Sequence, residues 1–204
     1  RIGQTITVDN KPGAGATLGG AALARSANDG YTIMLGSIVD SAIAPHVHKS
    51  LAFDMARDFS PIVEVGFGTV ILVVNADVPA RNVAELIALA KAKPGSLSYA
   101  SSGLGGLQHL NAEMFKQMAG VDLVHVPYKG AAPSVMALLS GEVSASFVDY
   151  ATLKAHVESG KLRAIAVSST ARSPWTPDVP TFTEQGFPGF ESFSWVGLFV
   201  TGKT

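Results

Sequence analysis

The order of apolar and polar residues along the chain predicts strands that alternate with helices. Helical spacing is clearest over residues 82–93, which Pro94-Gly95 ends. Its apolar positions fall on one face: Val83, Leu86, Ile87 and Ala90. A second helix is predicted over residues 17–27, after the glycine-rich stretch 13–17. Both segments are typical of helices that cover a sheet.

Strand-like runs precede and follow these helices. The early ones span residues 31–35, 61–65 and 68–75. Three strand–helix units come next: 97–101 with 106–119, 123–126 with 131–140, and 144–148 with 150–159. A further strand is predicted at 162–168, and a proline-rich stretch over 174–188 is expected to cross the surface. This order predicts an α/β fold with a mainly parallel sheet and helices on its faces.

Two long apolar strands, 69–75 and 193–200, bracket the middle of the chain. In one interpretation both strands cross between two lobes. Lobe 1 then holds residues 1–75 plus 193–204, and lobe 2 holds residues 76–192. In the other interpretation both are central strands of one continuous sheet. The spacing alone leaves both arrangements open.

Composition narrows the class of protein. Of the 204 residues, 47% are apolar and 15% are charged, which is typical of a folded α/β protein. The formal net charge of −1 gives no electrostatic argument for nucleic acid or an anionic membrane as partner. No cysteine is present, which excludes disulfides, thiolate metal sites and thiol nucleophiles. Because the chain starts at Arg1, we expect a processed or incomplete N-terminus.

The strongest chemical signal is the glycine-rich turn that follows the strand 97–101. Ser102, Gly103, Gly105 and Gly106 stand where a helix begins. The first turn of a helix has unpaired N–H groups and partial positive charge, and glycine lets a ligand approach the backbone. The turn therefore predicts a site for a carboxylate or phosphate. A plain tight turn is the competing interpretation. A dinucleotide site is disfavoured because Gln108 stands where the third glycine of that fingerprint belongs.

Three other strand ends carry candidate ligand-binding residues. Tyr128 offers an aromatic wall beside a second helix start, although it could simply pack the loop. Asp149 precedes Tyr150 at a third strand end, where a helix cap is the simpler role for its carboxylate. Ser37 lies in the stretch 36–41, whose two hydroxyls could face the other loops across a cleft.

Catalytic interpretations find little support in these residues. The five histidines show no metal-ligand spacing with carboxylates, and no G-x-S-x-G elbow is present. Ser102 and His109 could form a nucleophile–base pair, but no third group is evident to orient the histidine. We therefore expect a binding protein rather than an enzyme, with no cofactor and no metal.

Several motifs together resemble one known family. They are Asp9-Asn10-Lys11-Pro12-Gly13-Ala14-Gly15, Asp29-Gly30-Tyr31-Thr32, Tyr99-Ala100-Ser101-Ser102-Gly103, His125-Val126-Pro127-Tyr128-Lys129-Gly130, Gly160-Lys161-Leu162-Arg163-Ala164 and Pro177-Asp178-Val179-Pro180-Thr181. In order and register, the chain resembles the extracytoplasmic solute receptors of tripartite tricarboxylate transporters, the Bug family. The resemblance implies a type II periplasmic binding fold, with two α/β lobes joined by two crossing strands. It also implies a periplasmic location, a carboxylate ligand and membrane transporter subunits as partners.

By matching position, the resemblance assigns the ligand's proximal carboxylate to Ser102, Gly103, Gly105 and Gly106. Ser37 is expected to approach from the other lobe, and Asp149 and Tyr150 to read the far end of the ligand. The family commonly has Asn at the position of Leu104 and a hydroxyl residue at that of Gly106. The resemblance implies di- and tricarboxylates, acidic amino acids and aromatic acids as candidate ligands, and these departures make the mouth of the cleft more apolar, which favours a more apolar or aromatic acid.

The resemblance leaves two other classes open. The effector domains of some transcription regulators share this architecture, and a small enzyme could be built on the same fold. The family also begins earlier and ends later than this chain, with a ligand-contacting loop before it and helices after it.

Overall fold

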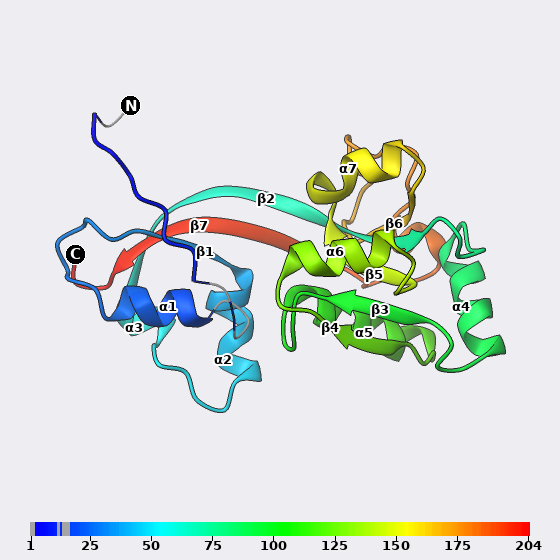
Figure 1. Ribbon diagram of the computed structural model, residues 1–204, viewed down its shortest axis with the longest axis horizontal. Helices are drawn as coiled ribbons and strands as arrows, with labels where there is room; N and C mark the ends of the chain where they lie inside the picture. The colour runs from blue at the N-terminus through cyan, green and yellow to red at the C-terminus, as the bar shows by residue number, and fades with distance from the viewer. Residues whose placement is uncertain (1–2, 12, 14–16) are drawn as a thin grey trace.

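The computed structural model describes residues 3–11, 13 and 17–204, and it has two lobes (Figure 1). Two long strands join them, β2 (Phe59–Asn75) and β7 (Phe193–Thr201), and these strands pair antiparallel. β2 starts in the sheet of the first lobe and ends in the sheet of the second. The two-lobe interpretation is therefore correct, and the sheets of the two lobes are hydrogen-bonded into one seven-stranded path through β2.

β2 was expected as two strands, 61–65 and 68–75, but it is one strand of 17 residues. Its register with β7 shifts between Pro61 and Val63 and again between Glu64 and Gly66. Bulges of this kind bend a strand and increase its twist, and they tolerate a proline that cannot donate to the ladder. One strand can therefore serve two sheets.

Lobe 1 is a three-stranded antiparallel sheet with helices beside it. β1 (Met34–Ser37) pairs with β7, which pairs with β2. Four short helical segments accompany the sheet: α1 (Thr17–Ala24), the π-helical turn η2 (Val39–Ile43), α2 (Ala44–Val47) and α3 (Met55–Asp58). The small core joins Leu23 of α1 to Phe53, Phe59 and Phe199. The predicted helix 17–27 is present as α1 but ends at Ala24, and the glycine-rich stretch before it lies largely outside the described residues.

Lobe 2 has a mixed sheet. Residues 70–75 of β2 pair antiparallel with β5 (Ala145–Asp149) and β6 (Leu162–Val167). β5 then pairs in parallel with β3 (Ser98–Ser101), which pairs in parallel with β4 (Val124–Pro127). The prediction of a mainly parallel sheet was wrong, because β2 enters from the other lobe against the direction of its neighbours.

Helices cover both faces of the lobe 2 sheet (Figure 1). α4 (Val83–Ala92) and α5 (Leu107–Ala119) pack on one face, and α6 (Ala131–Leu139) and α7 (Tyr150–Glu158) pack on the other. Alternate residues of β2 serve the two cores, with Leu72 in the first and Ile71 and Val73 in the second. A strand that is buried on both faces must be apolar throughout, which explains its sequence.

The proline-rich stretch 174–188 does more than cross the surface. Thr181 bridges to Val167 of β6, and the short 3-10 helix η3 (Thr183–Gln185) follows. Phe182 is fully buried, and its ring stacks on that of Phe190 with 3.9 Å between centroids. Aromatic pairs of this type add to the stability that area burial supplies. This stretch therefore completes a core.

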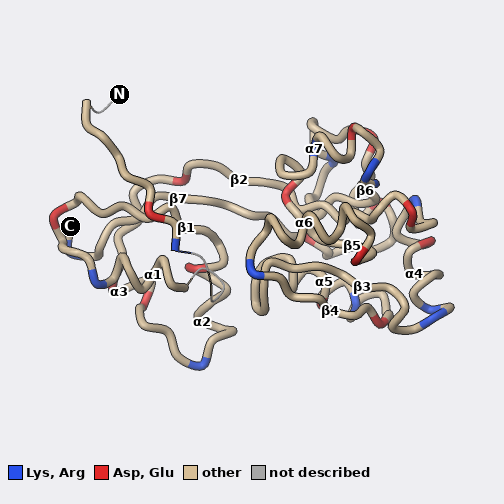
Figure 2. Tube along the Cα trace, viewed as in Figure 1, with Lys and Arg blue, Asp and Glu red and all other residues tan. Residues whose placement is uncertain are grey.

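The predicted division at residues 75/76 and 192/193 stays a prediction, since residues 70–75 of β2 already hydrogen-bond within lobe 2. Acidic and basic residues are interspersed over both lobes (Figure 2). Among the described residues, no helix has the length and apolar character needed to cross a membrane.

Candidate functional site

The glycine-rich turn lies between β3 and α5, at the carboxyl edge of the parallel strands. Gly103 has φ +140° and Gly105 has φ +74°, conformations that a residue with a Cβ rarely adopts. Gly106 is the N-cap of α5 and supplies no side-chain cap. The turn thus needs glycine at two positions for its shape and leaves the helix start uncapped.

In three of the four residues that the sequence assigns to the carboxylate, the backbone N–H is used within the turn. The N–H of Ser102 donates to Oε1 of Gln108 at 2.6 Å, and the N–H of Gly103 donates to Oγ of Ser101 at 3.2 Å. The N–H of Gly105 donates to Nδ1 of His109 at 3.2 Å. These bonds hold the turn in shape, much as a capping box fixes a helix start.

Other donors in the turn have no partner within the described part of the chain. They are the hydroxyl of Ser102 and the N–H groups of Gly106 and Leu107. The Ser102 hydroxyl lies 3.5 Å from the point where a Cβ on Gly106 would stand, so it sits over the helix start. These donors, together with the partial positive charge of α5, suit a carboxylate.

A second layer of side chains lies behind the turn, and sequence reasoning missed it. Ser101 is fully buried, and its Oγ lies 2.6 Å from Nε2 of His125 and 3.1 Å from the carbonyl oxygen of Gly103. The rings of His109 and His125 stack with centroids 4.3 Å apart. Tyr99 stacks on His125 at 4.7 Å. These side chains meet because the register of β3 against β4 places Tyr99 opposite His125. The sequence alone does not give that register.

An ion-paired group closes this layer on the α5 side. The Tyr99 hydroxyl donates to Oε1 of Glu113 at 2.7 Å, and Lys116 Nζ approaches the same oxygen at 2.9 Å. Burial raises the pKa of Tyr99, and the bond to Glu113 adds to that rise. Burial also acts to raise the pKa of Glu113, but the bonds from Tyr99 and Lys116 outweigh it and the net pKa is lowered. Tyr99 therefore stays a donor and Glu113 an acceptor.

On lobe 1, Ser37 ends β1 and binds Asp40. The backbone N–H and the hydroxyl of Ser37 both donate to Oδ2 of Asp40, at 2.8 Å and 3.0 Å. The Ser37 hydroxyl also accepts from the N–H of Val39 at 3.2 Å. This S-x-x-D arrangement resembles a capping box at the start of a helical segment. The spacing could have predicted the helical turns at 39–47, which the sequence reading missed.

The two lobes touch at the glycine turn. A Cβ built on Gly105 would lie 2.5 Å from Cγ1 of Val47, the last residue of α2. Leu104, beside it, is 66% exposed. The turn of lobe 2 therefore lies against an apolar side chain of lobe 1.

Asp149 stands at the N-cap of α7, but its carboxylate does not cap that helix. Instead it accepts a hydrogen bond from the hydroxyl of Ser194 in β7. A Cβ on Gly68 of β2 would lie 2.8 Å from Oδ1 of Asp149 and 3.0 Å from Oγ of Ser194. The expected cap was wrong because this strand crossing brings a better donor to the carboxylate. The bond ties β5 to the crossing strand β7, and Gly68 of β2 lies beside it.

Comparison with known proteins decides the family. The family model for the tripartite tricarboxylate transporter family receptor, TctC, matches residues 1–204. The chain belongs to this family. It is 37% identical to protein BugT of Bordetella pertussis (strain Tohama I) over 204 residues, which cover all of this chain and 63% of that protein. The resemblance drawn from the motifs is therefore confirmed.

Solved structures agree with this TctC-family assignment. The structure of R. palustris Rpa4515 with adipate superposes with a TM-score of 0.96 at 33% identity, covering 100% of this chain and 68% of that one. The periplasmic binding protein BugD gives a TM-score of 0.93 at 35% identity, covering 99% and 68%. The fold is thus the two-lobed one of these binding proteins. The chain spans about three-fifths of the length of the curated relatives it matches.

Tyr128 and Tyr150 of this TctC-family protein pack against one core. The Tyr128 hydroxyl donates to Oε1 of Glu142 at 2.7 Å, and burial together with that bond raises its pKa to about 12. Tyr150 begins α7 and packs, partly buried, against the core under α6 and α7. Both rings pack against that same core, and their contact with a ligand stays a prediction.

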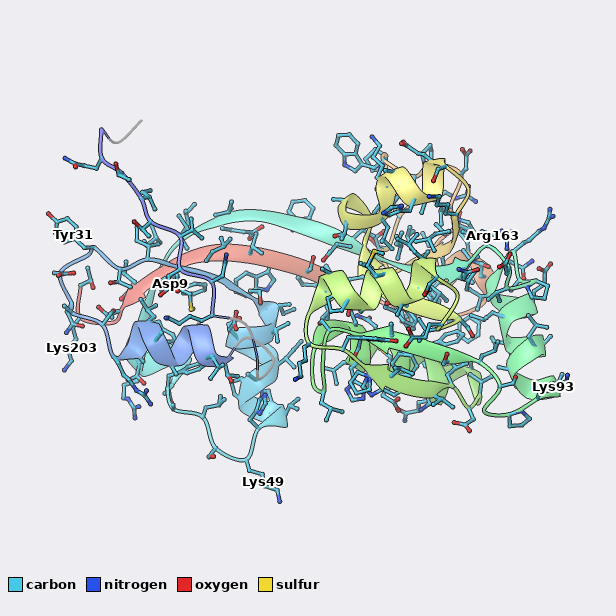
Figure 3. All side chains as sticks on the ribbon, viewed as in Figure 1. Asp9, Tyr31, Lys49, Lys93, Arg163 and Lys203 are labelled. Atoms are coloured by element: carbon cyan, nitrogen blue, oxygen red, sulfur yellow. The ribbon has the colours of Figure 1, made fainter. Side chains whose placement is uncertain are left out.

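A hollow in lobe 1 lies away from the predicted site. A cavity of about 600 Å³ in lobe 1 lies between α1 and the loop that follows α2, and Lys11, Arg25 and His48 are among its lining residues. None of the predicted ligand-binding residues lines it. Charged side chains such as Lys49, Lys93 and Lys203 point outward at the extremities (Figure 3).

The histidine layer predicts how stability depends on pH. Burial, and then the charge of His109, lowers the pKa of His125 below its usual 6.5. The unfolded chain therefore binds more protons than the folded one between the folded pKa and 6.5. Stability is full above pH 6.5, falls as the pH drops through the folded pKa, and levels off below it. Urea unfolding between pH 5 and 8 measures this.

His125→Gln should flatten the pH dependence in that window, whereas His46→Gln, an exposed change on α2, should leave the slope as it is. A slope that persists in His125→Gln would contradict the assignment to His125.

Proposed function

We propose that the protein is a periplasmic receptor that captures a small carboxylate between its lobes and delivers it to membrane transporter subunits. It acts by reversible binding and not as an enzyme. The observation that carries the proposal is the uncapped start of α5. There the Ser102 hydroxyl and the N–H groups of Gly106 and Leu107 have no partner in the described structure, and Gly105 of the same turn lies against Val47 of the other lobe.

The similarity to solved structures supports the same proposal. Rpa4515 was solved with adipate, a carboxylate, and BugD is a periplasmic binding protein. We infer that Gly103 and Gly105 shape the turn and that Ser102 and Gly106 bind the carboxylate. Ser37 approaches from lobe 1, and Tyr128, Asp149 and Tyr150 form the wall around the rest of the ligand. The lobes are residues 1–75 plus 193–204 and residues 76–192.

A thermal-shift screen tests the proposal on the full-length protein. A ligand that binds only the folded state raises the melting temperature by mass action. The screen should include di- and tricarboxylates, acidic and other amino acids, hydroxy acids and aromatic acids. We expect at least one acid to raise the melting temperature in proportion to the logarithm of its concentration. If none does, the proposed function is wrong.

Ser102→Ala should weaken the binding of the best acid by roughly 10-fold, because a hydrogen bond to a charged group contributes about 1.5–3 kcal/mol. Melting temperature without ligand should stay nearly unchanged, since the Ser102 hydroxyl has no partner among the described residues. Isothermal titration calorimetry measures the affinity. Ser159→Ala, at the end of α7, is the matched control and should bind like the natural sequence. Equal affinities for the two variants would remove Ser102 from the site.

A further inference from the structure

Asp40 is a buried carboxylate in lobe 1, three residues after Ser37. Only 4% of the residue is exposed. Its Oδ2 accepts both donors of Ser37, while its Oδ1 has no hydrogen-bond partner within the described residues. A buried carboxylate depends on every donor it has. The hydroxyl proton of Ser37 is therefore held by Asp40 and is not free to turn toward a ligand.

The other hydroxyl of this stretch is also occupied. Ser41 donates to the carbonyl oxygen of Ser37 at 2.8 Å. The Ser37 oxygen accepts one bond, from the N–H of Val39, and keeps one lone pair. Thus neither hydroxyl of the stretch 36–41 offers a proton. Ser37 can only accept a hydrogen bond from a ligand.

The strand register places a second acceptor on the same side of the sheet. Ser37 pairs with Val196 of β7, and Ser194 lies two residues before Val196, so all three side chains lie on one face. The Ser194 hydroxyl donates to the Asp149 carboxylate. Lobe 1 and the strand crossing therefore present oxygen acceptors and negative charge, whereas the start of α5 in lobe 2 presents donors.

We propose that the ligand carries one carboxylate, bound at the start of α5, and a hydrogen-bond donor, a hydroxyl or an ammonium, directed at Ser37. Asp40 is the positioning residue that fixes Ser37 as an acceptor and disfavours a second carboxylate there. The inference rests on the proposed function and names the ligand class of the same site. Like charges that meet at a binding surface are strongly unfavourable, so the discrimination is large.

Three matched series of acids test the inference by calorimetry on the full-length protein. In each series one end group changes while the length is kept: succinate, 4-hydroxybutyrate and 4-aminobutyrate; glutarate, 5-hydroxypentanoate and 5-aminopentanoate; adipate, 6-hydroxyhexanoate and 6-aminohexanoate. At the best length, we expect the hydroxy or amino acid to bind at least about 10-fold more tightly than the dicarboxylate.

Asp40→Asn distinguishes the role of the charge from a structural one. The amide oxygen can still accept from Ser37, but the negative charge is lost. We expect the affinity for the hydroxy or amino acid, divided by the affinity for the dicarboxylate of the same length, to fall by about 10-fold. A merely structural defect would weaken the binding of all acids alike. Asp122→Asn, just beyond the far end of α5, is the matched control and should leave the ratio unchanged. Should Asp40→Asn not fold, Ser37→Ala carries the same test, because it removes the acceptor.

The outcomes separate this inference from the proposed function. If carboxylates bind but the dicarboxylate is the tightest in every series, the inference is overturned and the receptor function stands. An affinity ratio that does not change in Asp40→Asn, or in Ser37→Ala if that variant replaces it, also overturns it. If no acid of any class binds, the proposed function itself falls.

Discussion

Gly105→Ala should reduce ligand affinity by roughly 10- to 100-fold, the largest loss we expect from a single added methyl group. The new Cβ would lie 2.5 Å from Cγ1 of Val47, so the lobes could not close to their present separation. A β-branched residue in a helix has one strongly preferred rotamer, and Val47 ends α2, so it cannot simply turn away. Calorimetric titration of the best acid from the screen measures the loss.

Gly105→Ala should also lower stability by about 1–2 kcal/mol, because Gly105 has φ +74° and alanine is strained there. The two effects can be separated. In Gly105→Ala/Val47→Ala the methyl group that clashes is gone while the backbone strain remains. We expect affinity to recover and stability to stay low. If affinity does not recover in the double variant, Val47 is not what opposes closure.

Ser101→Val should destabilise the protein by about 2–4 kcal/mol and abolish ligand binding. Ser101 is fully buried at the end of β3, and its hydroxyl joins Nε2 of His125 to both polar groups of Gly103. Valine leaves these buried groups without a partner, and its additional methyl group has to be accommodated at a fully buried position. The melting temperature should fall by roughly 5–15 °C in differential scanning calorimetry.

Ser146→Ala provides the matched comparison for Ser101→Val. Ser146 lies in the neighbouring strand β5, is 1% exposed, and makes one hydrogen bond, to the carbonyl oxygen of Ala100 at 3.0 Å. Its loss should cost about 1 kcal/mol and leave ligand affinity intact. If Ser101→Val proves no more harmful than Ser146→Ala, the layer behind the turn does not support the site.

Most of the helices and strands of lobe 2 could be predicted from periodicity. The predicted helix 82–93 is α4 (Val83–Ala92), and the three strand–helix units that follow it are present with ends shifted by a residue or two. Their signals are local, since apolar spacing and the breakers Pro and Gly act within one segment. Lobe 1 was predicted less well. Its short helical turns at 39–47 have little amphipathic pattern, and only the S-x-x-D spacing of Ser37 and Asp40 marks their start.

The glycine turn with which the site begins was found from sequence for a physical reason. The helix start and the positive-φ glycines are properties of the turn itself, so Gly103 and Gly105 could be read directly. The sequence could not show which N–H groups of the turn remain free. The side chains of Gln108 and His109 fold back onto the turn and accept the N–H groups of Ser102 and Gly105. The role of Asp149 was missed similarly, as its partner Ser194 lies 45 residues away.

The sequence by itself determined the class of fold, the family and the position of the glycine-rich turn that we propose binds the carboxylate, because each follows from local pattern or from motifs in order. The tertiary structure alone decided which lobe presents hydrogen-bond donors at the proposed site and which presents acceptors. It placed His125 under Ser101 and Val47 against Gly105, and with the hydroxyl proton of Ser37 directed at Asp40 it left lobe 1 with acceptors. These relations depend on strand register, on the contact between the lobes and on which groups are left without a partner, and none of these is fixed until the chain is packed.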